Sequence, residues 1–510
     1  MAEIRGILRE HGGTRHCYTL RRVLKRTAIV VHRWLGVVLC LFFVLWFPSG
    51  IGMMYWDFPE VTPADRLKHA RSLDPRSVRF SPADAYARLS LSQPPEDVRL
   101  NTFDGRPVYR FRTGDVSSVV YADTGEEQAP LSRDMMQRIA AAWTGQPADA
   151  ASVDAIEEAD QWTVQNFRRV QPVWKYSWPN GEQVYVSEAS GEVVQYTTPA
   201  SRLGAYLGPI PHWLYFAPLR RHSVPWSRVV IWSSGLGVIT AIFGIVVGLW
   251  MYSPGKQYRY EGAPARIPYR GWKRWHTVIG LIFGLGTVTW AFSGMLSMDP
   301  FPIAAPPRDA RPNRIPEAFD ERAPLSAFAP RQPREIIAAL PRDAVRELDF
   351  RAFGGQPIVL ATLAGGDTRI VPLDGAPRVA LDRQDVETVV TAAARPASVV
   401  EVRELTSYDR YYIDRHHQRP LPVLLVRVDD GAESRYYVDP KTASIVGTYS
   451  SRVWVTRWLY HGLHSLDFPW LYGYRPLWDI VVITFMLGGT ALSVTSLVLA
   501  WRVIGRKLTT

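Results

Sequence analysis

The chain has 510 residues, too many for one compact domain, and its mean hydropathy of −0.09 is too low for a protein that lies mostly in a membrane. Its net charge of +11 does not indicate nucleic-acid binding, because much of the basic excess flanks apolar segments, where it indicates membrane topology. The only cysteines, Cys17 and Cys40, exclude a disulfide framework and a cysteine-based metal site. We therefore expect a few membrane spans that carry large polar regions.

Four apolar runs are long enough to cross a bilayer, which takes about 20 apolar residues. The first run is too long for a signal peptide and has no small-residue cleavage site, so we expect it to be retained. Basic residues precede the first run, fill the loop between the second and third, and follow the fourth, which predicts that both termini are cytoplasmic. The first half is predicted to consist of a cytoplasmic tail (1–27), helix 1 (28–55), outer region 1 (57–226) and helix 2 (229–251), followed by a cytoplasmic loop (253–275). The second half is predicted to consist of helix 3 (276–298), a linker with outer region 2 (299–476), helix 4 (479–501) and a cytoplasmic tail (502–510).

The first and third apolar runs begin with the same phrase, and eight of 23 aligned positions are identical. Each phrase starts with a histidine that a glycine follows four residues later, His32 with Gly36 and His276 with Gly280. Residues spaced by four share one face of a helix. A ligating imidazole beside small residues leaves a flat slot, which is the shape that a porphyrin could fill.

The two outer regions repeat as well. Phe103-Asp-Gly-Arg-Pro107 corresponds to Phe353-Gly-Gly-Gln-Pro357, 250 residues further on. Alternating apolar residues and Asp-Thr-Gly or Ser-Gly-Glu turns predict short strands at residues 108–112, 119–122 and 183–186 after a short helix. We therefore predict a tandem duplication of span, α+β region and span, with a pseudo-two-fold axis along the membrane normal.

A second pair of recurring histidines, His212 and His464, precedes the second and fourth spans, where five of 15 aligned positions are identical. His461 lies one turn before His464, but its counterpart in the first half is Pro209. Equivalent positions around the predicted axis lie at the same depth, so the histidines of the first and third spans pair near the inner face. His212 and His464 pair near the outer face. Each pair could supply two axial nitrogens to one b-type haem.

Simpler interpretations remain. A single histidine at the end of a span is commonly an interfacial polar residue, although ionisable residues within spans tend to be functional. His416 and His417 have no counterpart in the first half, and adjacent side chains point in different directions, so they are a poor metal site. The sequence has no dinucleotide fingerprint, phosphate-binding loop or zinc-binding helix motif, so a redox function would take its electrons from another protein or from quinol.

The His-x₃-Gly spans that end in Ser-Gly, the Leu-His-Ser-Leu approach to the last span and the Asp-Thr-Gly strand modules resemble the PepSY-associated transmembrane family. The resemblance covers nearly the whole chain except the N-terminal tail and residues 299–330. It implies an α-helical protein of the bacterial inner membrane, with four transmembrane helices plus two periplasmic α+β PepSY-like domains. It also implies two b-type haems and reductive release of iron, with ligands at His32, His276, His212 and His464. The first half departs from the Leu-His-x-Leu form around His212.

The expected function is therefore electron transfer from a quinol or a cytoplasmic reductase to a ferric siderophore outside, near Trp213, Tyr215, Trp470 and Tyr472. Ferrous iron holds hard oxygen ligands less tightly than ferric iron, so reduction would loosen the chelate. One alternative is a non-redox PepSY-domain protein that binds or regulates an envelope peptidase or another partner, and a second is a siderophore or haem permease. The sequence leaves open the siderophore, the electron donor, the oligomeric state and whether His461 or His464 is the outer ligand.

Overall fold

The computed structural model describes residues 2–508 apart from 115, 261, 301–312, 342, 343 and 415, and without the side chains of 2–22, 260 and 508. Most of the linker predicted to begin at residue 299 and the extreme ends of both predicted tails lie outside the described residues. The chain divides into two compact units. The bundle unit comprises residues 1–58, 203–303 and 454–510, and the sheet unit comprises residues 59–202 and 304–453.

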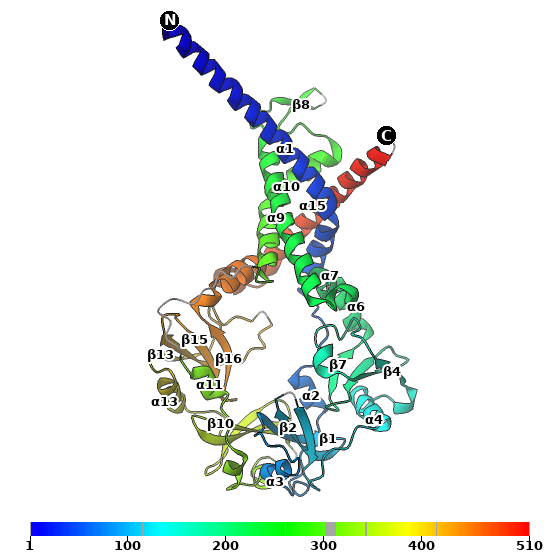
Figure 1. The fold of residues 1–510 in the computed structure, drawn as a ribbon, viewed down its shortest axis with the longest axis vertical. Coiled ribbons are helices and arrows are strands. Elements are labelled where there is room, and N and C mark those ends of the chain that lie inside the picture. Colours follow the sequence, from blue (N-terminus) through cyan, green and yellow to red (C-terminus); the bar gives the residue numbers. More distant parts are fainter. Residues whose placement is uncertain are drawn as a thin grey trace. The chain divides into compact units, whose positions relative to one another are not determined.

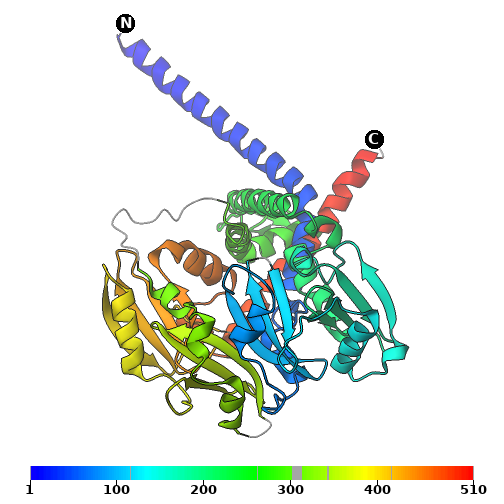
Figure 2. The ribbon, with the colours of Figure 1, turned by 60° about the horizontal axis from the view of Figure 1, so that its bottom comes forward.

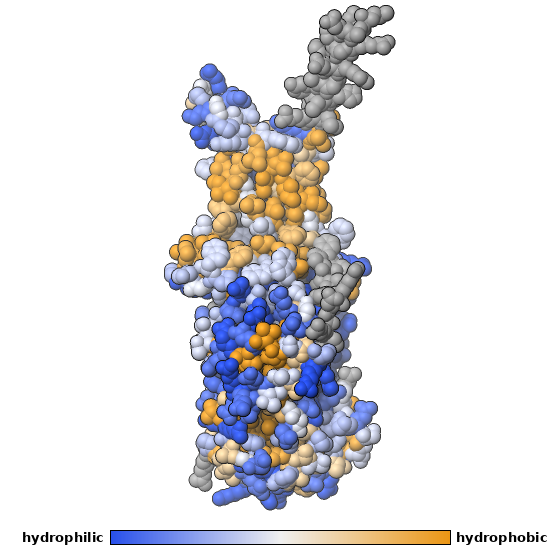
Figure 3. All heavy atoms as spheres, turned by 90° about the vertical axis from the view of Figure 1, so that its left-hand side faces the viewer, coloured by the Kyte–Doolittle hydropathy of each residue, from blue (hydrophilic) through white to orange (hydrophobic). Residues whose placement is uncertain are grey.

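The bundle unit is built from four long helices (Figure 1): α1 (Ala2–Gly52), α9 (Ser223–Met251), α10 (Gly271–Leu296) and α15 (Leu477–Leu508). Helices α1 and α10 each pack against both α9 and α15. All four are long and apolar enough to cross a membrane, and in α1 the candidate span is Val23–Gly52. A belt of apolar side chains covers the visible face of the bundle (Figure 3), so the prediction of four apolar helices is confirmed.

Glycines let the bundle helices approach each other closely, as small residues do in membrane proteins. A Cβ atom on Gly489 of α15 would overlap the ring of Phe47 of α1, and one on Gly488 would overlap the ring of Phe283 of α10. Phe47 also packs edge-on against Trp290, with ring centres 6.0 Å apart. The middle of the bundle is therefore a packed aromatic core.

The end of α1 crosses the junction of helices α6 (Pro199–Leu207) and α7 (Pro209–Trp213) at backbone distance. A Cβ atom on Gly52 would overlap the Leu207 carbonyl, which belongs to the backbone and has little freedom to move. We therefore expect Gly52→Ala to lower the free energy of unfolding by about 1–3 kcal/mol, the usual cost of overpacking. Thermal unfolding in detergent measures this change. Gly505→Ala is the control, because a Cβ there meets nothing within 4 Å; equal melting temperatures for both variants would contradict the close crossing.

The sheet unit holds a six-stranded sheet to which both halves of the chain contribute (Figure 2), in the order β12-β11-β10-β1-β2-β3. The halves meet where β1 and β10 pair antiparallel, with Arg99 opposite Asp349 and Leu100 opposite Leu348. Both leucines are fully buried in the core of this sheet. Its strands are β1 (Asp97–Phe103), β2 (Arg106–Thr113), β3 (Val116–Tyr121), β10 (Val345–Phe353), β11 (Gln356–Leu363) and β12 (Thr368–Pro372).

Two four-stranded antiparallel sheets complete the unit, and a longer helix packs on each, α4 on the first and α13 on the second. Helix α4 begins at the N-cap Ser132 and ends at Gly145, whose φ of 70° suits glycine. Met136 of α4 packs on Val184 in the core of the first sheet. The elements are α4 (Arg133–Thr144) with β4 (Ser152–Ile156), β5 (Val173–Ser177), β6 (Gln183–Ser187) and β7 (Val193–Thr197), and α13 (Arg383–Ala393) with β13 (Ser398–Leu405), β14 (Val423–Asp429), β15 (Arg435–Asp439) and β16 (Ser444–Tyr449).

The order of elements in the first half recurs in the second: a short helix, three strands, a longer helix and four strands. The strands predicted at 108–112, 119–122 and 183–186 correspond to β2, β3 and β6. The short helices are α3 (Pro82–Ala87) and α12 (Pro333–Ala338). The remaining elements are α2 (Pro63–His69), η1 (Ala148–Ala150), α5 (Phe167–Val170), α8 (Ala217–Arg220), β8 (Tyr258–Tyr260), β9 (Ala263–Ala265), α11 (Ile315–Phe319), η2 (Leu325–Phe328), η3 (Ser451–Val453), the π-helix η4 (Val455–Gly462) and α14 (Pro469–Tyr472).

Candidate functional site: two histidine pairs in the helix bundle

The first histidine pair lies between α1 and α10. The ring centres of His32 and His276 are 6.0 Å apart, with the ring planes at 41°. Nδ1 of His32 lies 2.9 Å from the carbonyl oxygen of Thr240 in α9. Nδ1 of His276 lies 3.1 Å from Oγ1 of Thr495 in α15, and that hydroxyl donates its own proton to the carbonyl of Leu492. Each imidazole of the first pair is thus held by the helix that follows it in its own half of the chain.

The second pair joins His212, in α7, to His464, just after η4. Their ring centres are 5.8 Å apart, with the ring planes at 63°. Nδ1 of His212 lies 3.1 Å from the carbonyl oxygen of Trp46, and Nδ1 of His464 lies 3.0 Å from Oγ of Ser293. The indole of Trp290 donates to the carbonyl oxygen of His464 at 2.8 Å.

The Trp-x₂-Ser-Gly motif that recurs in the first and third spans contacts both histidines of the second pair. Oγ of Ser49 donates to backbone carbonyls of its own helix and lies 3.3 Å from Nδ1 of His212. Ser293 does the same beside His464 and is fully buried. A Cβ atom on Gly294 would lie 3.4 Å from Cε1 of His464, so a larger residue would meet the imidazole at once. The repeated segments of α1 and α10 therefore contain His32 and His276 and also contact His212 and His464.

These partners fix the protonation of all four imidazoles. Each Nδ1 faces a carbonyl oxygen, or a hydroxyl whose proton is already donated, so Nδ1 carries the hydrogen and Nε2 the lone pair. Burial lowers the pKa of His212 to about 4, and burial together with the neighbouring His212 lowers the pKa of His464 to about 3. Both rings are therefore neutral at pH 7. A neutral imidazole whose other nitrogen donates to a fixed acceptor is the usual form of a metal-ligating histidine.

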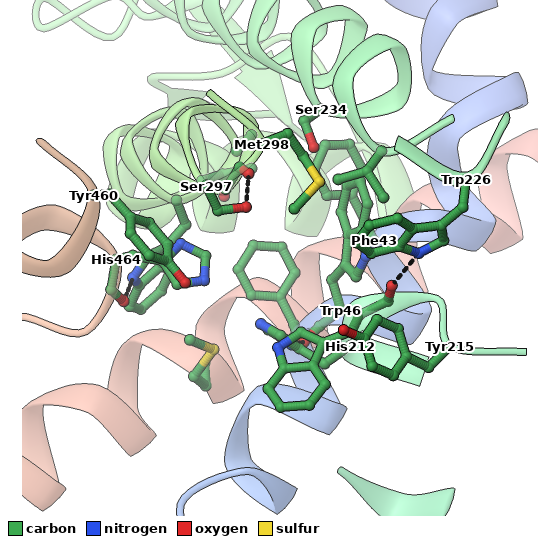
Figure 4. Close-up of a pocket in the computed structure, with 18 residues that line it drawn as sticks. Phe43, Trp46, His212, Tyr215, Trp226, Ser234, Ser297, Met298, Tyr460 and His464 are labelled. Carbon is green, nitrogen blue, oxygen red and sulfur yellow. Dashed lines mark hydrogen bonds between the residues drawn. The ribbon is translucent and has the colours of Figure 1, made fainter. Parts of the chain in front are cut away.

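A cavity of about 280 Å³ adjoins the second pair (Figure 4), near the lower end of the range for small-molecule sites, about 300–1,000 Å³. Aromatic side chains supply much of its wall, with a few hydroxyl groups such as that of Ser234. The indole of Trp226 is fixed by a hydrogen bond of 2.9 Å to the carbonyl of Trp213. The aromatic wall residues are Phe43, Trp46, Phe47, Trp213, Tyr215, Trp226, Trp290 and Tyr460. An apolar pocket with two convergent imidazoles is suited to an aromatic ligand.

The glycines predicted beside the first pair are not tightly packed against another helix. A Cβ atom on Gly36 would meet nothing within 4 Å, and one on Gly280 would lie 3.6 Å from Leu492. A different glycine, Gly244 of α9, packs closely against His32, because a Cβ atom on Gly244 would lie 2.7 Å from Cε1 of His32. Sequence reasoning missed Gly244. Comparison of the second and fourth spans could have found it, because Ser496 holds the equivalent position and lies 3.4 Å from Nδ1 of His276.

His461 and His464 occupy different environments. His461 is exposed, and the ring of Tyr460 contacts both imidazoles, with its centre 4.6 Å from that of His461 and 5.5 Å from that of His464. The ring of His464 packs against that of His212.

The other candidates differ in their surroundings. His416 and His417 sit in an exposed loop of the sheet unit, and no group of three or more metal-ligating residues occurs among the described residues. Trp213 and Tyr215 line the cavity beside the second pair, Trp470 is exposed, and Tyr472 packs against Trp478.

Comparison with curated proteins found no match. The model of the PepSY-associated TM region matches residues 29–336. The matched residues include α9, α10, most of the apolar part of α1, and His32, His212 and His276. Because this match covers more than half of the chain, and four helices are long and apolar enough to cross a membrane, the protein belongs to the PepSY-associated transmembrane family.

Proposed function

We propose that the protein binds two b-type haems and transfers electrons across the bacterial inner membrane to ferric siderophores. The observation that carries the proposal is the separation of the two histidine pairs, with ring centres 6.0 and 5.8 Å apart. Two imidazoles bonded to one iron from opposite sides, each at about 2 Å, have ring centres about 6 Å apart. The spacing and the available Nε2 lone pairs both suit bis-histidine ligation.

The surroundings of the pairs also suit the group. A bound haem would supply a one-electron redox centre whose potential depends on its ligands and their partners. The acceptors at Nδ1 of His212 and His464 raise the basicity of both imidazoles and hold their ring orientations. The wall of the cavity is mostly apolar, and a Cβ atom on Gly36 would meet nothing within 4 Å, which leaves room on that face of α1.

The direction of transfer follows from the chain's topology. Ser49, which contacts His212, follows His32 by 17 residues, or about 25 Å of helix, so the two pairs lie at well-separated levels along α1. Basic residues gather at the His32 end, which the positive-inside rule assigns to the cytoplasm. The donor there would be a quinol or a cytoplasmic reductase. The chain enters the sheet unit from the His212 end, so we assign residues 59–202 and 304–453 to the periplasm.

We infer that the chain arose by tandem duplication of span, α+β region and span. The repeated order of elements supports this inference, and so does the composition of each pair, which takes one histidine from each half. A two-fold relation of this kind would explain why each pair takes its two histidines from equivalent positions of the two halves.

The first test is the pigment itself. Protein purified in detergent from haem-replete cells is expected to contain about two low-spin b-type haems per chain, one for each bis-histidine pair. The absorption spectrum and a pyridine haemochrome assay measure this content. His69→Ala is the control, because His69 lies in the sheet unit, stacked on Trp143. Colourless wild-type protein would contradict the redox proposal and favour the non-redox binding alternative.

A further inference from the structure

The sheet unit contains a second cavity, of about 620 Å³, between the edge strand β3 and the turn that joins β6 to β7. Its volume lies well within the range of ligand sites, about 300–1,000 Å³. One wall contains Ser117 and Ser118 of β3, and the opposite wall contains residues 188–190 of the turn. Phe103 and Leu131 contribute apolar surface. No part of this cavity belongs to the bundle unit, so it is independent of the histidine pairs.

The second half of the chain is closed at the equivalent place. Strand register shows which residues of the two sheet halves are equivalent. Ser117 of β3 pairs with Arg112 of β2, and Thr368 of β12 pairs with Thr362 at the corresponding position of β11, so Ser117 corresponds to Thr368. The turn between β15 and β16 is the counterpart of the turn between β6 and β7. In the second half Thr368 Oγ1 donates to the carbonyl of Lys441 at 2.9 Å, and the Leu381 N–H donates to the carbonyl of Pro440 at 2.8 Å. The turn's own backbone therefore closes onto the sheet.

In the first half the same four positions form opposing walls of the cavity. Ser117 corresponds to Thr368, Leu131 to Leu381, Glu188 to Pro440 and Ala189 to Lys441, and all four first-half residues line the cavity. The contacts that close the second half are thus replaced by open space in the first. In the second half, polypeptide backbone occupies the equivalent space, which indicates that the cavity of the first half can accept a polypeptide segment.

Strand β3 presents an open backbone edge to this cavity. It is the outermost strand of its sheet, and residues 126–128 fold back along only part of it. The Tyr121 N–H donates to the Glu126 carbonyl at 2.9 Å, and the Gln128 N–H donates to the Val119 carbonyl at 2.7 Å. Outward-facing backbone groups alternate along an antiparallel edge, so Ser117 faces the same way as Val119 and Tyr121. The covering segment ends at Gln128 and does not reach Ser117, which leaves a place where an extended chain can pair.

The charge of the residues that line the cavity determines which side chains a bound polypeptide segment should carry. Among the described residues that line the cavity, Glu127 and Glu188 are charged and none is lysine or arginine. The side-chain oxygen of Gln128 is buried without a hydrogen-bond partner. The indole of Trp174 donates to one oxygen of Glu188 at 2.8 Å, which fixes that carboxylate in place. The cavity therefore offers acceptors and negative charge to a donor-bearing, basic side chain.

We propose that this cavity is a docking site for an extended polypeptide segment of a partner protein, which pairs with β3 at Ser117 and places a lysine or arginine side chain near Glu127 and Glu188. Backbone pairing supplies the binding, and the two carboxylates supply the preference for a basic residue. In the second half the hydrogen bonds of Thr368 and Leu381 to residues 440 and 441 close the equivalent space.

The test uses the full-length protein in detergent on an array of randomised synthetic octapeptides. The wild type is expected to select peptides with lysine or arginine, and the strongest is then titrated in solution. Ser117→Pro should weaken its binding about tenfold, because proline removes the outward N–H yet is tolerated on an edge strand. Glu127→Gln and Glu188→Gln should each weaken it about two- to fivefold, as expected for partly exposed ion pairs. Glu157→Gln, an exposed carboxylate of the sheet unit that does not line the cavity, is the matched control and should bind as the wild type does.

Hydrogen exchange locates the site, with added protection expected at residues 116–118 and none at 367–369. Absence of selected peptides, equal selection of acidic ones, or undiminished binding to both Ser117→Pro and the two glutamine variants would each overturn the proposal. The haem content of every variant should match that of the wild type, so failure here is distinguishable from failure of the haem proposal.

Discussion

His276→Ala is expected to remove the haem of the first pair and to leave that of the second, while His464→Ala does the reverse. Each variant should therefore retain about one haem per chain, since each bis-histidine site loses one axial ligand of two. The two sites are separable because about 25 Å of α1 lies between His32 and Ser49, which contacts His212. A pyridine haemochrome assay gives the number of haems, and low-temperature optical spectra of the two variants should sum to the spectrum of the wild type.

His461→Ala is the matched control for the second site. His461 is exposed, whereas His464 packs against His212 and is bonded through Nδ1 to Ser293. The control should therefore keep both haems. If His461→Ala lost one haem and His464→Ala lost none, the ligand would be the residue one turn earlier. Loss of both haems in His276→Ala would instead mean that the two sites depend on each other for folding.

The features that the sequence predicted well have a local or repeated signature. An apolar run of sufficient length is visible without any knowledge of its neighbours, and four such runs correspond to α1, α9, α10 and α15. The pairing of histidines by depth used only the repeat and the positive-inside rule. The structure brings the same histidines together, His32 with His276 and His212 with His464.

The features that sequence reasoning missed depend on contacts between distant segments. Ser293 contacts His464, which lies 171 positions further along the chain, and Gly244 packs against His32, which lies 212 positions before it. Neither contact leaves a periodic pattern in one helix. The joining of the two halves through β1 and β10 was also not predicted, because strand order within a sheet is decided by tertiary packing. The small residues singled out at Gly36 and Gly280 were chosen for their helix face alone, and the structure shows that other glycines contact the imidazoles.

The second large effect concerns the electron acceptor. Dithionite-reduced wild-type protein should be reoxidised by a ferric siderophore, with ferrous iron appearing to a chelator such as ferrozine. His464→Ala should slow this reoxidation at least about tenfold, because its loss removes the redox centre nearest the periplasmic side in the proposed topology. Stopped-flow absorbance in the Soret region gives the rate. His416→Ala with His417→Ala is the matched control, since that pair lies in an exposed loop of the sheet unit and should leave the rate unchanged.

The size of a ferric siderophore indicates on which side the proposed reaction would take place. At the proposed cytoplasmic side the loop between α9 and α10 spans only residues 252–270, whereas residues 59–202 and 304–453 belong to the sheet unit. A ferric siderophore therefore has a recognition surface of adequate size only on the proposed periplasmic side. The cavity lined by His212 and His464 also offers aromatic surface there. If a variant lacking both of these histidines were reoxidised as fast as the wild type, electrons would reach the siderophore without the second pair, and the inside-to-outside route would have to be abandoned.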